Sequence, residues 1–232
     1  MRAQAPVNQE QGRSRTVGVI ASPAALERAP RLRRLPDFFE LRLDLLHHSL
    51  GMIELALPRL RAPVILTARH PAEGGAGRLP LQTRRDLILR FLAGAALVDL
   101  EFRSVRRMPA LREEMQRRGV GLILSRHDLR DTPSLGTLRR FAQAAAGYQP
   151  AILKVATRTD TPAQLARLLA FFEETRLAFP VAAMGIGTLG LASRRRLALL
   201  GSALTYASLD RTVVLGQPTL ADLCRARRAY SK

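Results

Sequence analysis

Short apolar runs alternate along this chain with longer stretches in which apolar residues recur at helical spacing. The short runs predict strands at residues 16–22, 38–45, 63–69, 97–102, 120–127, 150–156, 181–186 and 203–208. Amphipathic stretches between them predict helices, with examples at 81–93, 108–118, 134–146 and 161–178. Alternating strands and helices indicate a parallel sheet covered by helices. Eight such units in a chain of this length predict an α/β fold, a single-domain (β/α)8 barrel of the TIM type.

Charged residues interrupt the predicted strands with a period of two. Glu40, Arg42 and Asp44 alternate with leucines, which places the three charges on one face of an extended chain. Similar polar positions recur near the ends of later strands, at Thr67, Arg69, Asp99, Glu101, Ser125, His127 and Lys154. Strands buried in a parallel sheet are normally apolar throughout. We therefore expect these side chains to project into the barrel near the carboxyl ends of the strands, where barrel enzymes keep their chemistry.

The composition is that of a globular protein. The chain has 232 residues, of which 47% are hydrophobic, and we expect one barrel domain over residues 16–232 behind a short basic tail at 1–15. We see no apolar run long enough to span a membrane and no signal peptide at the start, so we expect no membrane association and a cytoplasmic location. Cys224 is the single cysteine, which excludes a disulfide framework and any multi-cysteine metal site.

The formal net charge of +18 raises the question of nucleic-acid binding. The arginines are scattered in small groups, mostly in predicted helices, where a solvated face is the simpler interpretation. Aromatic residues make up 5% of the chain and tryptophan is absent, which gives little material for stacking on bases. Nucleic acid is therefore an unlikely partner, although a non-catalytic nucleic-acid-binding or regulatory protein stays open as an alternative.

The bias toward arginine makes Lys154 conspicuous. It lies inside a predicted strand, and the only other lysine among the 37 lysine and arginine residues is Lys232. An amine can lose its proton and attack a carbonyl, which a guanidinium does not do. We therefore favour a nucleophilic role for Lys154 over the alternative of a structural lysine in a salt bridge.

His127 and Glu73 are candidates for proton transfer. His127 ends a predicted strand, and an ordinary imidazole titrates near neutral pH. Glu73 follows the strand that ends in Arg69, and a carboxylate beside a histidine can hold its tautomer; the alternative is a solvated loop residue. The histidines have no metal-ligand spacing, so we expect neither a catalytic metal nor a cofactor.

A G-x-G-x-x-G motif occurs at Gly185, Gly187 and Gly190, and Asp210 lies twenty residues beyond it. This pattern is typical of dinucleotide-binding folds. Too little chain follows Asp210 for the further strands that such a fold needs. We favour a glycine-rich loop at the barrel mouth that presents Arg194 to a bound anion.

Seven ordered segments of the chain resemble the type I 3-dehydroquinate dehydratase family, whose members are (β/α)8 barrels. The segments are Glu40-Leu-Arg42-Leu-Asp44, Thr67-Ala-Arg69 with Glu73-Gly-Gly, Ser125-Arg-His127-Asp, Leu153-Lys154-Val, Gly187-Thr-Leu-Gly190-Leu-Ala-Ser193-Arg194, Gly201-Ser202 with Thr205-Tyr206, and Gly216-Gln217-Pro. The resemblance extends from about residue 16 to the last predicted helix. It implies dehydration of 3-dehydroquinate to 3-dehydroshikimate in the shikimate pathway, without a cofactor, by a homodimer.

The resemblance also implies roles for individual residues. Lys154 would form a Schiff base with the substrate ketone, His127 would act as general acid and base, and Glu73 would orient His127. The residues implied in substrate binding are Ser22, Glu40, Arg42, Arg69, Arg194 and Gln217.

The chain departs from the family pattern at two positions. Val213 stands where the family usually has a serine, and Ile186 replaces a methionine that commonly opens the glycine-rich motif. These departures predict altered substrate affinity and leave open a divergent Schiff-base lyase or aldolase on the same barrel. The sequence also leaves open whether the role is biosynthetic or serves the breakdown of quinate.

Overall fold

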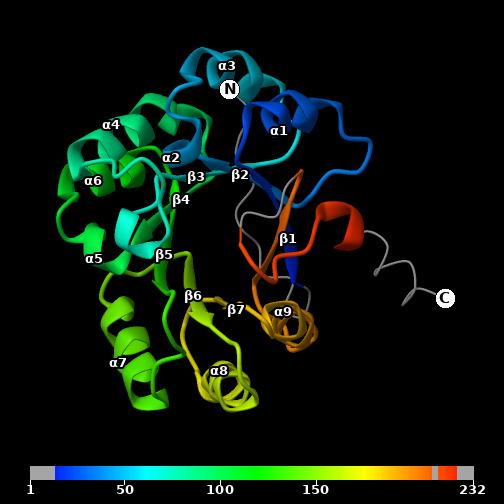
Figure 1. Ribbon diagram of the computed structural model, residues 1–232. Coiled ribbons are helices and arrows are strands. Elements are labelled where there is room, and N and C mark those ends of the chain that lie inside the picture. Colours follow the sequence, from blue (N-terminus) through cyan, green and yellow to red (C-terminus); the bar gives the residue numbers. More distant parts are fainter. Residues whose placement is uncertain (1–13, 211–213, 224–232) are drawn as a thin grey trace.

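Eight parallel strands form the inner layer of the fold, and helices cover their outer face (Figure 1). The computed structural model describes residues 14–210 and 214–223. The strands are β1 (Arg15–Ile20), β2 (Phe38–Arg42), β3 (Val64–Thr67), β4 (Leu97–Glu101), β5 (Gly121–Asp128), β6 (Ile152–Arg158), β7 (Val181–Ile186) and β8 (Leu204–Ser208). The α-helices are α1 (Pro23–Arg28), α2 (Leu43–Leu46), α3 (Leu50–Ala56), α4 (Leu81–Phe91), α5 (Phe102–Val105), α6 (Pro109–Arg117), α7 (Leu135–Ala146), α8 (Pro162–Glu174) and α9 (Gly190–Leu199). Short 3-10 turns lie at Ala29–Arg31, Leu57–Arg59, Pro71–Glu73 and Leu92–Gly94.

The strands follow the order β7-β6-β5-β4-β3-β2-β1-β8, so β8 pairs with β1 and the sheet curls round on itself. Its two outer strands meet without a regular ladder. The amide of Ala203 donates to the carbonyl of Val181 at 2.9 Å. The Ser202 hydroxyl accepts from the amide of Ala183 at 3.0 Å and donates to its carbonyl at 3.2 Å. The result is a nearly closed barrel, and the predicted (β/α)8 fold is confirmed.

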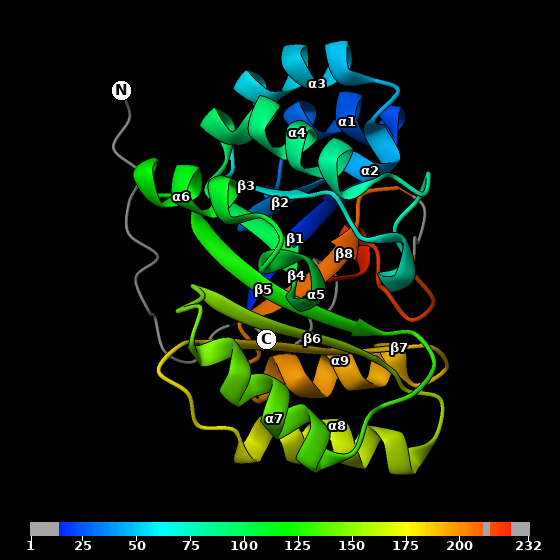
Figure 2. The same ribbon diagram turned by 90° about the vertical axis from the view of Figure 1, so that its left-hand side faces the viewer.

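Two apolar layers hold the barrel together. One fills its interior and includes Val17, Phe38, Ile65, Leu97, Ile123, Ile152 and Leu204. The other lies between the outer face of the strands and the helices. Figure 2 shows α1, α3 and α4 on one side of the strands and α7, α8 and α9 on the other. Because apolar residues fill the inner layer, only the ends of the strands leave room for polar side chains.

The predicted ends of the second and third strands need correction. The strand expected over 38–45 stops at Arg42, because the chain turns into α2 at Leu43. Asp44 therefore lies in a helical turn and not on the strand face with Glu40. The strand expected over 63–69 stops at Thr67, so Arg69 belongs to the segment that follows β3.

The expectation that grouped arginines lie on solvated helix faces is wrong for Arg84. Arg85 beside it is more open to solvent, but Arg84 is 1% exposed and points from α4 toward β4. Its guanidinium donates to Glu101 at 3.1 Å and to the hydroxyl of Ser104 at 3.2 Å. A buried arginine requires such partners, because an unpaired buried charge is costly.

Several expectations fall outside the described residues. These are most of the predicted basic tail, the departure at Val213, and Cys224. Arg15, which we had assigned to that tail, is the first residue of β1. Within residues 14–210 and 214–223, no helix has the length and apolar character needed to cross a membrane.

Replacing Ser202 tests the contact that closes the barrel. Ser202→Ala removes the hydroxyl and leaves the buried amide of Ala183 without its partner. We expect the free energy of unfolding in urea to fall by about 1–3 kcal/mol, the usual penalty for an unsatisfied buried group. Ser49→Ala is the control, since the Ser49 side chain makes no capping hydrogen bond. Equal stabilities of the two variants would show that Ser202 does not support closure.

Candidate active site

A pocket opens at the carboxyl ends of the strands and contains about 590 Å³ of space, part of it open to solvent. Every predicted site residue except Ser22 lines it, namely Glu40, Arg42, Arg69, Glu73, His127, Lys154, Arg194 and Gln217. These residues come from β2, β5, β6, α9 and the segments that follow β3 and β8. Parallel strands bring them together because all their carboxyl ends meet at one rim of the barrel.

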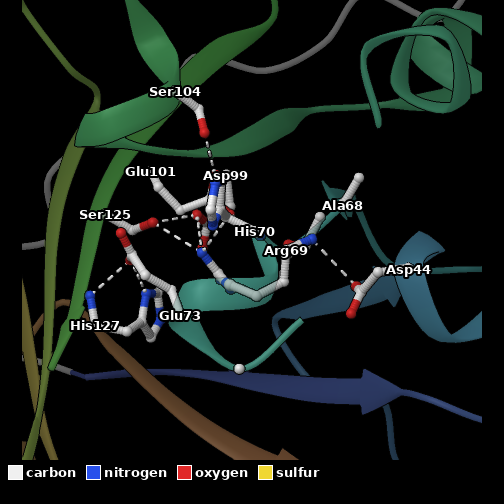
Figure 3. A network of polar contacts seen from close by, with 12 residues as sticks. Asp44, Ala68, Arg69, His70, Glu73, Asp99, Glu101, Ser104, Ser125 and His127 are labelled. Atoms are coloured by element: carbon white, nitrogen blue, oxygen red, sulfur yellow. Dashed lines mark hydrogen bonds and ion pairs between the residues drawn. The ribbon is translucent and has the colours of Figure 1, made fainter. Parts of the chain in front are cut away.

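The centre of the site is an ion pair between Arg69 and Asp99 (Figure 3). Two guanidinium nitrogens of Arg69 reach the two oxygens of Asp99 at 3.0 and 2.8 Å. The same guanidinium donates to the hydroxyl of Ser125 at 2.9 Å. Burial opposes charge on both groups, but Asp99 and Glu101 raise the pKa of Arg69. Burial also acts to raise the pKa of Asp99, but Arg69 and Lys154 hold it well below its usual value.

Lys154 projects from β6 into this charged cluster and is 4% exposed. Its Nζ donates to Asp99 at 2.9 Å and lies 3.7 Å from Glu40. The same nitrogen lies 3.9 Å from the centre of the Tyr206 ring, a distance at which an ammonium is attracted to the ring face. The amine is thus fixed between two carboxylates and an aromatic ring, on the floor of the pocket.

His127 and Glu73 form a hydrogen-bonded pair at the rim. The carboxylate oxygen Oε2 of Glu73 accepts from the backbone amide of His127 at 2.8 Å and lies 3.0 Å from its Nδ1. The other oxygen accepts from Nε of Arg103, a residue of α5, at 2.9 Å. Glu73 therefore holds the ring with Nδ1 protonated and leaves Nε2 as the free acceptor.

Burial sets the protonation of this pair. It lowers the pKa of His127 well below the usual value, and the nearby Arg69 and Lys154 lower it further. The imidazole is therefore neutral at neutral pH and able to accept a proton. Burial raises the pKa of Glu73 to about 6, although the amide of His127 and the guanidiniums of Arg69 and Arg103 act in the opposite direction.

Glu101 ties the pocket to the helix layer. Its oxygens accept hydrogen bonds from the backbone amide of His70 at 2.8 Å, from Ser104 at 2.9 Å and from Arg84 at 3.1 Å. Arg69 approaches the same carboxylate at 3.3 Å. The polar network thus runs from α4 through Glu101 to Arg69, and all of its side chains are buried.

Arg42 and Asp44 organise the loop after β3. Asp44 accepts two hydrogen bonds from Arg42 at 3.0 and 2.8 Å, and it also accepts the backbone amides of Arg69 and Ala76. Burial acts to raise the pKa of Asp44, but these bonds hold it below its usual value. Arg42 reaches the carbonyl of Gly74 at 3.4 Å as well. The pair therefore anchors the segment that carries Glu73.

The glycine-rich motif packs against the loop after β8. The amide of Gly187 donates to the carbonyl of Leu215 at 3.0 Å. Gly216 has φ of 85° in the left-handed region, and a Cβ there would lie 2.7 Å from the Cα of Gly190. This close approach positions Gln217 in the pocket, which agrees with the interpretation of the motif as part of a barrel mouth.

Arg194 lies behind the same motif, in the middle of α9. Its Nε donates to the carbonyl of Gly185 at 3.1 Å, while its Nη1 has no hydrogen-bond partner among the described residues. Burial lowers the pKa of this guanidinium to about 10. A buried cation with a free donor on a pocket wall is suited to binding an anion.

Ser22 is placed apart from the other predicted residues. It caps α1, where its hydroxyl accepts the amide of Ala25 at 3.0 Å, and it also donates to the carboxylate of Asp210. Over the described ranges, no cluster of three or more potential metal ligands occurs.

Sequence reasoning assigned no site role to Asp99, Ser125, Arg103 or Tyr206. Asp99 and Ser125 carried a signal, because they belong to the polar positions of period two. Arg103 lies in a short helix and has no sequence pattern that separates it from an ordinary surface residue. Tyr206 lies in an apolar strand, and its signal was its place in one of the segments that resemble the family.

The fold and the pocket define the class of this protein: a (β/α)8-barrel enzyme with a buried lysine and a histidine–carboxylate pair at the carboxyl ends of its strands. A profile of the type I 3-dehydroquinase family matches residues 19–232. The chain belongs to this family.

Individual relatives agree with this assignment. The 3-dehydroquinate dehydratase of Thermococcus gammatolerans is 34% identical over 209 residues, which cover 89% of this chain and 94% of the relative. That of Dehalococcoides mccartyi is 33% identical over 202 residues, covering 84% and 86%. The crystal structure of 3-dehydroquinate dehydratase from Geobacillus kaustophilus superposes with a TM-score of 0.83 at 27% identity, covering 94% of this chain and 93% of that one.

The raised pKa of Glu73 predicts that ionisation of this carboxyl lowers the free energy of unfolding. The folded state holds the proton up to about pH 6, whereas the ordinary value is 4.5, so the fold loses stability as the pH rises through this window. Glu73→Gln imitates the protonated carboxyl. We expect its free energy of unfolding to exceed that of the parent protein by about 2 kcal/mol at pH 8.

This gain should shrink as the pH falls from 6 toward 4.5, which chemical denaturation at a series of pH values will measure. Glu54→Gln is the matched control, because Glu54 is exposed and paired only with Arg90 at the surface. A gain that does not vary with pH would show that Glu73 is not the group responsible.

Proposed function

We propose that this chain dehydrates 3-dehydroquinate to 3-dehydroshikimate through a Schiff base on Lys154. The observation that carries the proposal is the placement of Lys154 and the His127–Glu73 pair in one pocket. Membership of the type I family and the names of the relatives support the substrate and the reaction. The reaction eliminates water and is a step of the shikimate pathway.

The first step is attack of the neutral Lys154 amine on the ketone of the substrate. A carbon–nitrogen bond forms and the carbon–oxygen bond breaks. The oxygen leaves as water with one proton from the amine and one from solvent, and the nitrogen keeps its other proton and a positive charge as an iminium. Asp99 and Glu40 lie beside this nitrogen in the ligand-free pocket. Fixed carboxylates at such positions stabilise the cation as it develops, without having to reorganise.

The second step removes a proton from the carbon next to the iminium. The iminium accepts the electron pair of the broken carbon–hydrogen bond and becomes an enamine, so no cofactor is needed. His127 takes the proton at Nε2, because Glu73 engages Nδ1 and burial keeps the ring neutral.

The last steps eliminate the hydroxyl and release the product. The enamine electrons expel the hydroxyl, which leaves as water with the proton that His127 now carries. Hydrolysis of the resulting iminium frees Lys154 and the enone. Each proton taken by His127 is thus returned within one turnover, which requires a group whose two protonation states are both accessible.

Substrate binding follows from the polar groups that line the pocket. Arg194 pairs with the substrate carboxylate, since burial has removed this cation from water. Glu40, Arg42, Arg69 and Gln217 face the space where the substrate hydroxyls would lie. Ser22 stays a predicted contact, and its hydrogen bond to Asp210 would have to open for it to reach the substrate.

Borohydride trapping tests the covalent step. Reduction during turnover should attach the substrate or product carbon skeleton to Lys154, and mass spectrometry of the peptides should locate it there. Lys154→Arg keeps the charge but removes the amine, so we expect turnover and the adduct to be lost. Lys232→Arg makes the same exchange at the other lysine and should behave as the parent protein. An active enzyme without an adduct at Lys154 would contradict the Schiff-base mechanism.

Removal of the imidazole tests the proton transfer. His127→Ala should lower kcat by roughly two to four powers of ten, the usual contribution of acid–base catalysis. Absorbance of the conjugated enone measures the rate, and His48→Ala, at an exposed histidine, is the control.

The same assays separate the alternatives. Aldol cleavage in place of dehydration would indicate a divergent Schiff-base lyase. Salt-dependent nucleic-acid binding without turnover would indicate a non-catalytic role. Assembly as a homodimer stays a prediction, which sedimentation will check.

A further inference from the structure

One wall of the pocket carries buried polar atoms that have no hydrogen-bond partner among the described residues. They are Nη1 of Arg194, the hydroxyl of Tyr206 and Oε1 of Gln217, and all three residues line the pocket. Unpartnered buried atoms are uncommon in folded proteins and require an explanation. Substrate binding already explains Arg194 and Gln217, whereas Tyr206 has no role in the reaction as derived above.

The position of Tyr206 is fixed by the barrel. The residue lies on β8, opposite Val17 of β1, and is 3% exposed. Its ring faces Nζ of Lys154 at 3.9 Å from the ring centre. The ring is therefore held against the reactive nitrogen, and the hydroxyl is carried on a rigid element beside the place where the substrate is bound.

The hydroxyl of Tyr206 is a donor that lacks an acceptor. Burial raises its pKa well above the usual value, and the carboxylates of Glu40 and Asp99 raise it further, while Arg69 and Arg194 act in the opposite direction. The group is thus protonated at neutral pH. The nearby carboxylates accept from other groups, Glu40 from Thr67 and Asp99 from Arg69, and neither bonds the Tyr206 hydroxyl, which is left free for an acceptor on a ligand.

An unsatisfied cation in the same pocket indicates which ligand group supplies the acceptor. Arg194 and Tyr206 both line the pocket, and Nη1 of the arginine and the hydroxyl of the tyrosine have no hydrogen-bond partner among the described residues. Two free donors in one pocket are suited to a carboxylate, which offers two oxygens.

We propose that Tyr206 is a specificity-determining residue whose hydroxyl donates a hydrogen bond to the substrate carboxylate that Arg194 binds. The inference rests on the proposed function, because it assigns a contact within the same pocket. It adds to Arg194 a second, uncharged donor for the same anion. Recognition of the carboxylate then depends on β8 as well as on α9.

Tyr206→Phe is the direct test, because it removes one oxygen and keeps the ring over Lys154. We expect KM for 3-dehydroquinate to rise roughly 10- to 100-fold, as for the loss of a hydrogen bond to a charged group. The value of kcat should stay within a few-fold, and the borohydride adduct at Lys154 should still form. Tyr148→Phe is the matched control, since Tyr148 lies outside the pocket, against Phe102 and Arg112.

An analogue of 3-dehydroquinate in which a carboxamide replaces the carboxylate tests which substrate group the Tyr206 hydroxyl contacts. A neutral amide oxygen makes a weaker hydrogen bond than a carboxylate, so Tyr206→Phe should weaken binding of the carboxamide by only a few-fold. Equal losses for the acid and the carboxamide would overturn the assignment to the carboxylate. An unchanged KM in a folded Tyr206→Phe protein would overturn the proposal as a whole.

Failure of the proposed function gives a different result from failure of the contact between Tyr206 and the carboxylate. A parent protein without turnover of 3-dehydroquinate would contradict that function, whatever the variant does. Calorimetric titration of the acid into the parent protein and Tyr206→Phe then still measures the contact, and equal affinities would overturn it.

Discussion

The pocket depends on one buried ion pair, that of Arg69 with Asp99. Taking these charges out of water is costly, and the cost is recovered only if each finds several partners. Arg69 meets this need by joining the segment after β3 to β4 and to Ser125 of β5. Asp99 in turn holds Lys154 of β6. The amine of Lys154 is therefore positioned by a chain of charges across four neighbouring units of the barrel, and not by its own strand alone.

The two sides of the pocket differ in how completely their polar groups are satisfied. On the side of β2 to β6, carboxylates and cations hold one another through hydrogen bonds, as between Glu73 and His127. On the side of β7 and β8, buried atoms of Arg194, Tyr206 and Gln217 have no partner in the described part of the chain. The first side is organised before a ligand arrives, which suits groups that stabilise charge during reaction. The second side gains its hydrogen bonds from the ligand, which suits recognition.

The sequence predicted the barrel and most of the pocket because both follow from regular spacing. The bias toward arginine singled out Lys154. The period of two located Glu40, since alternate residues of a strand share one face. It failed at Asp44, because nothing in that pattern marks where β2 gives way to a helical turn. Arg84 was missed for another reason: a helix arginine is usually solvated, and only the fold brings Glu101 and Ser104 to its guanidinium. Hydrogen-bond partners that only the tertiary structure brings together cannot be predicted from the spacing of residues along the chain.

In the described part of the chain the buried charges balance, so the positive excess there lies on residues that are not buried. In the described part of the chain, the buried carboxylates are Glu40, Asp44, Glu73, Asp99 and Glu101, and the buried cations are Arg42, Arg69, Arg84, Lys154 and Arg194, so the two sets are equal in number. Glu73, however, forms its ion pair with Arg103, whose side chain is 51% exposed and which is therefore not one of the buried cations. One buried cation is then left over, and the contacts identify it as Arg194. Because every other buried charge in the described part of the chain already has a counter-ion, an anionic ligand in this pocket would complete the balance at Arg194.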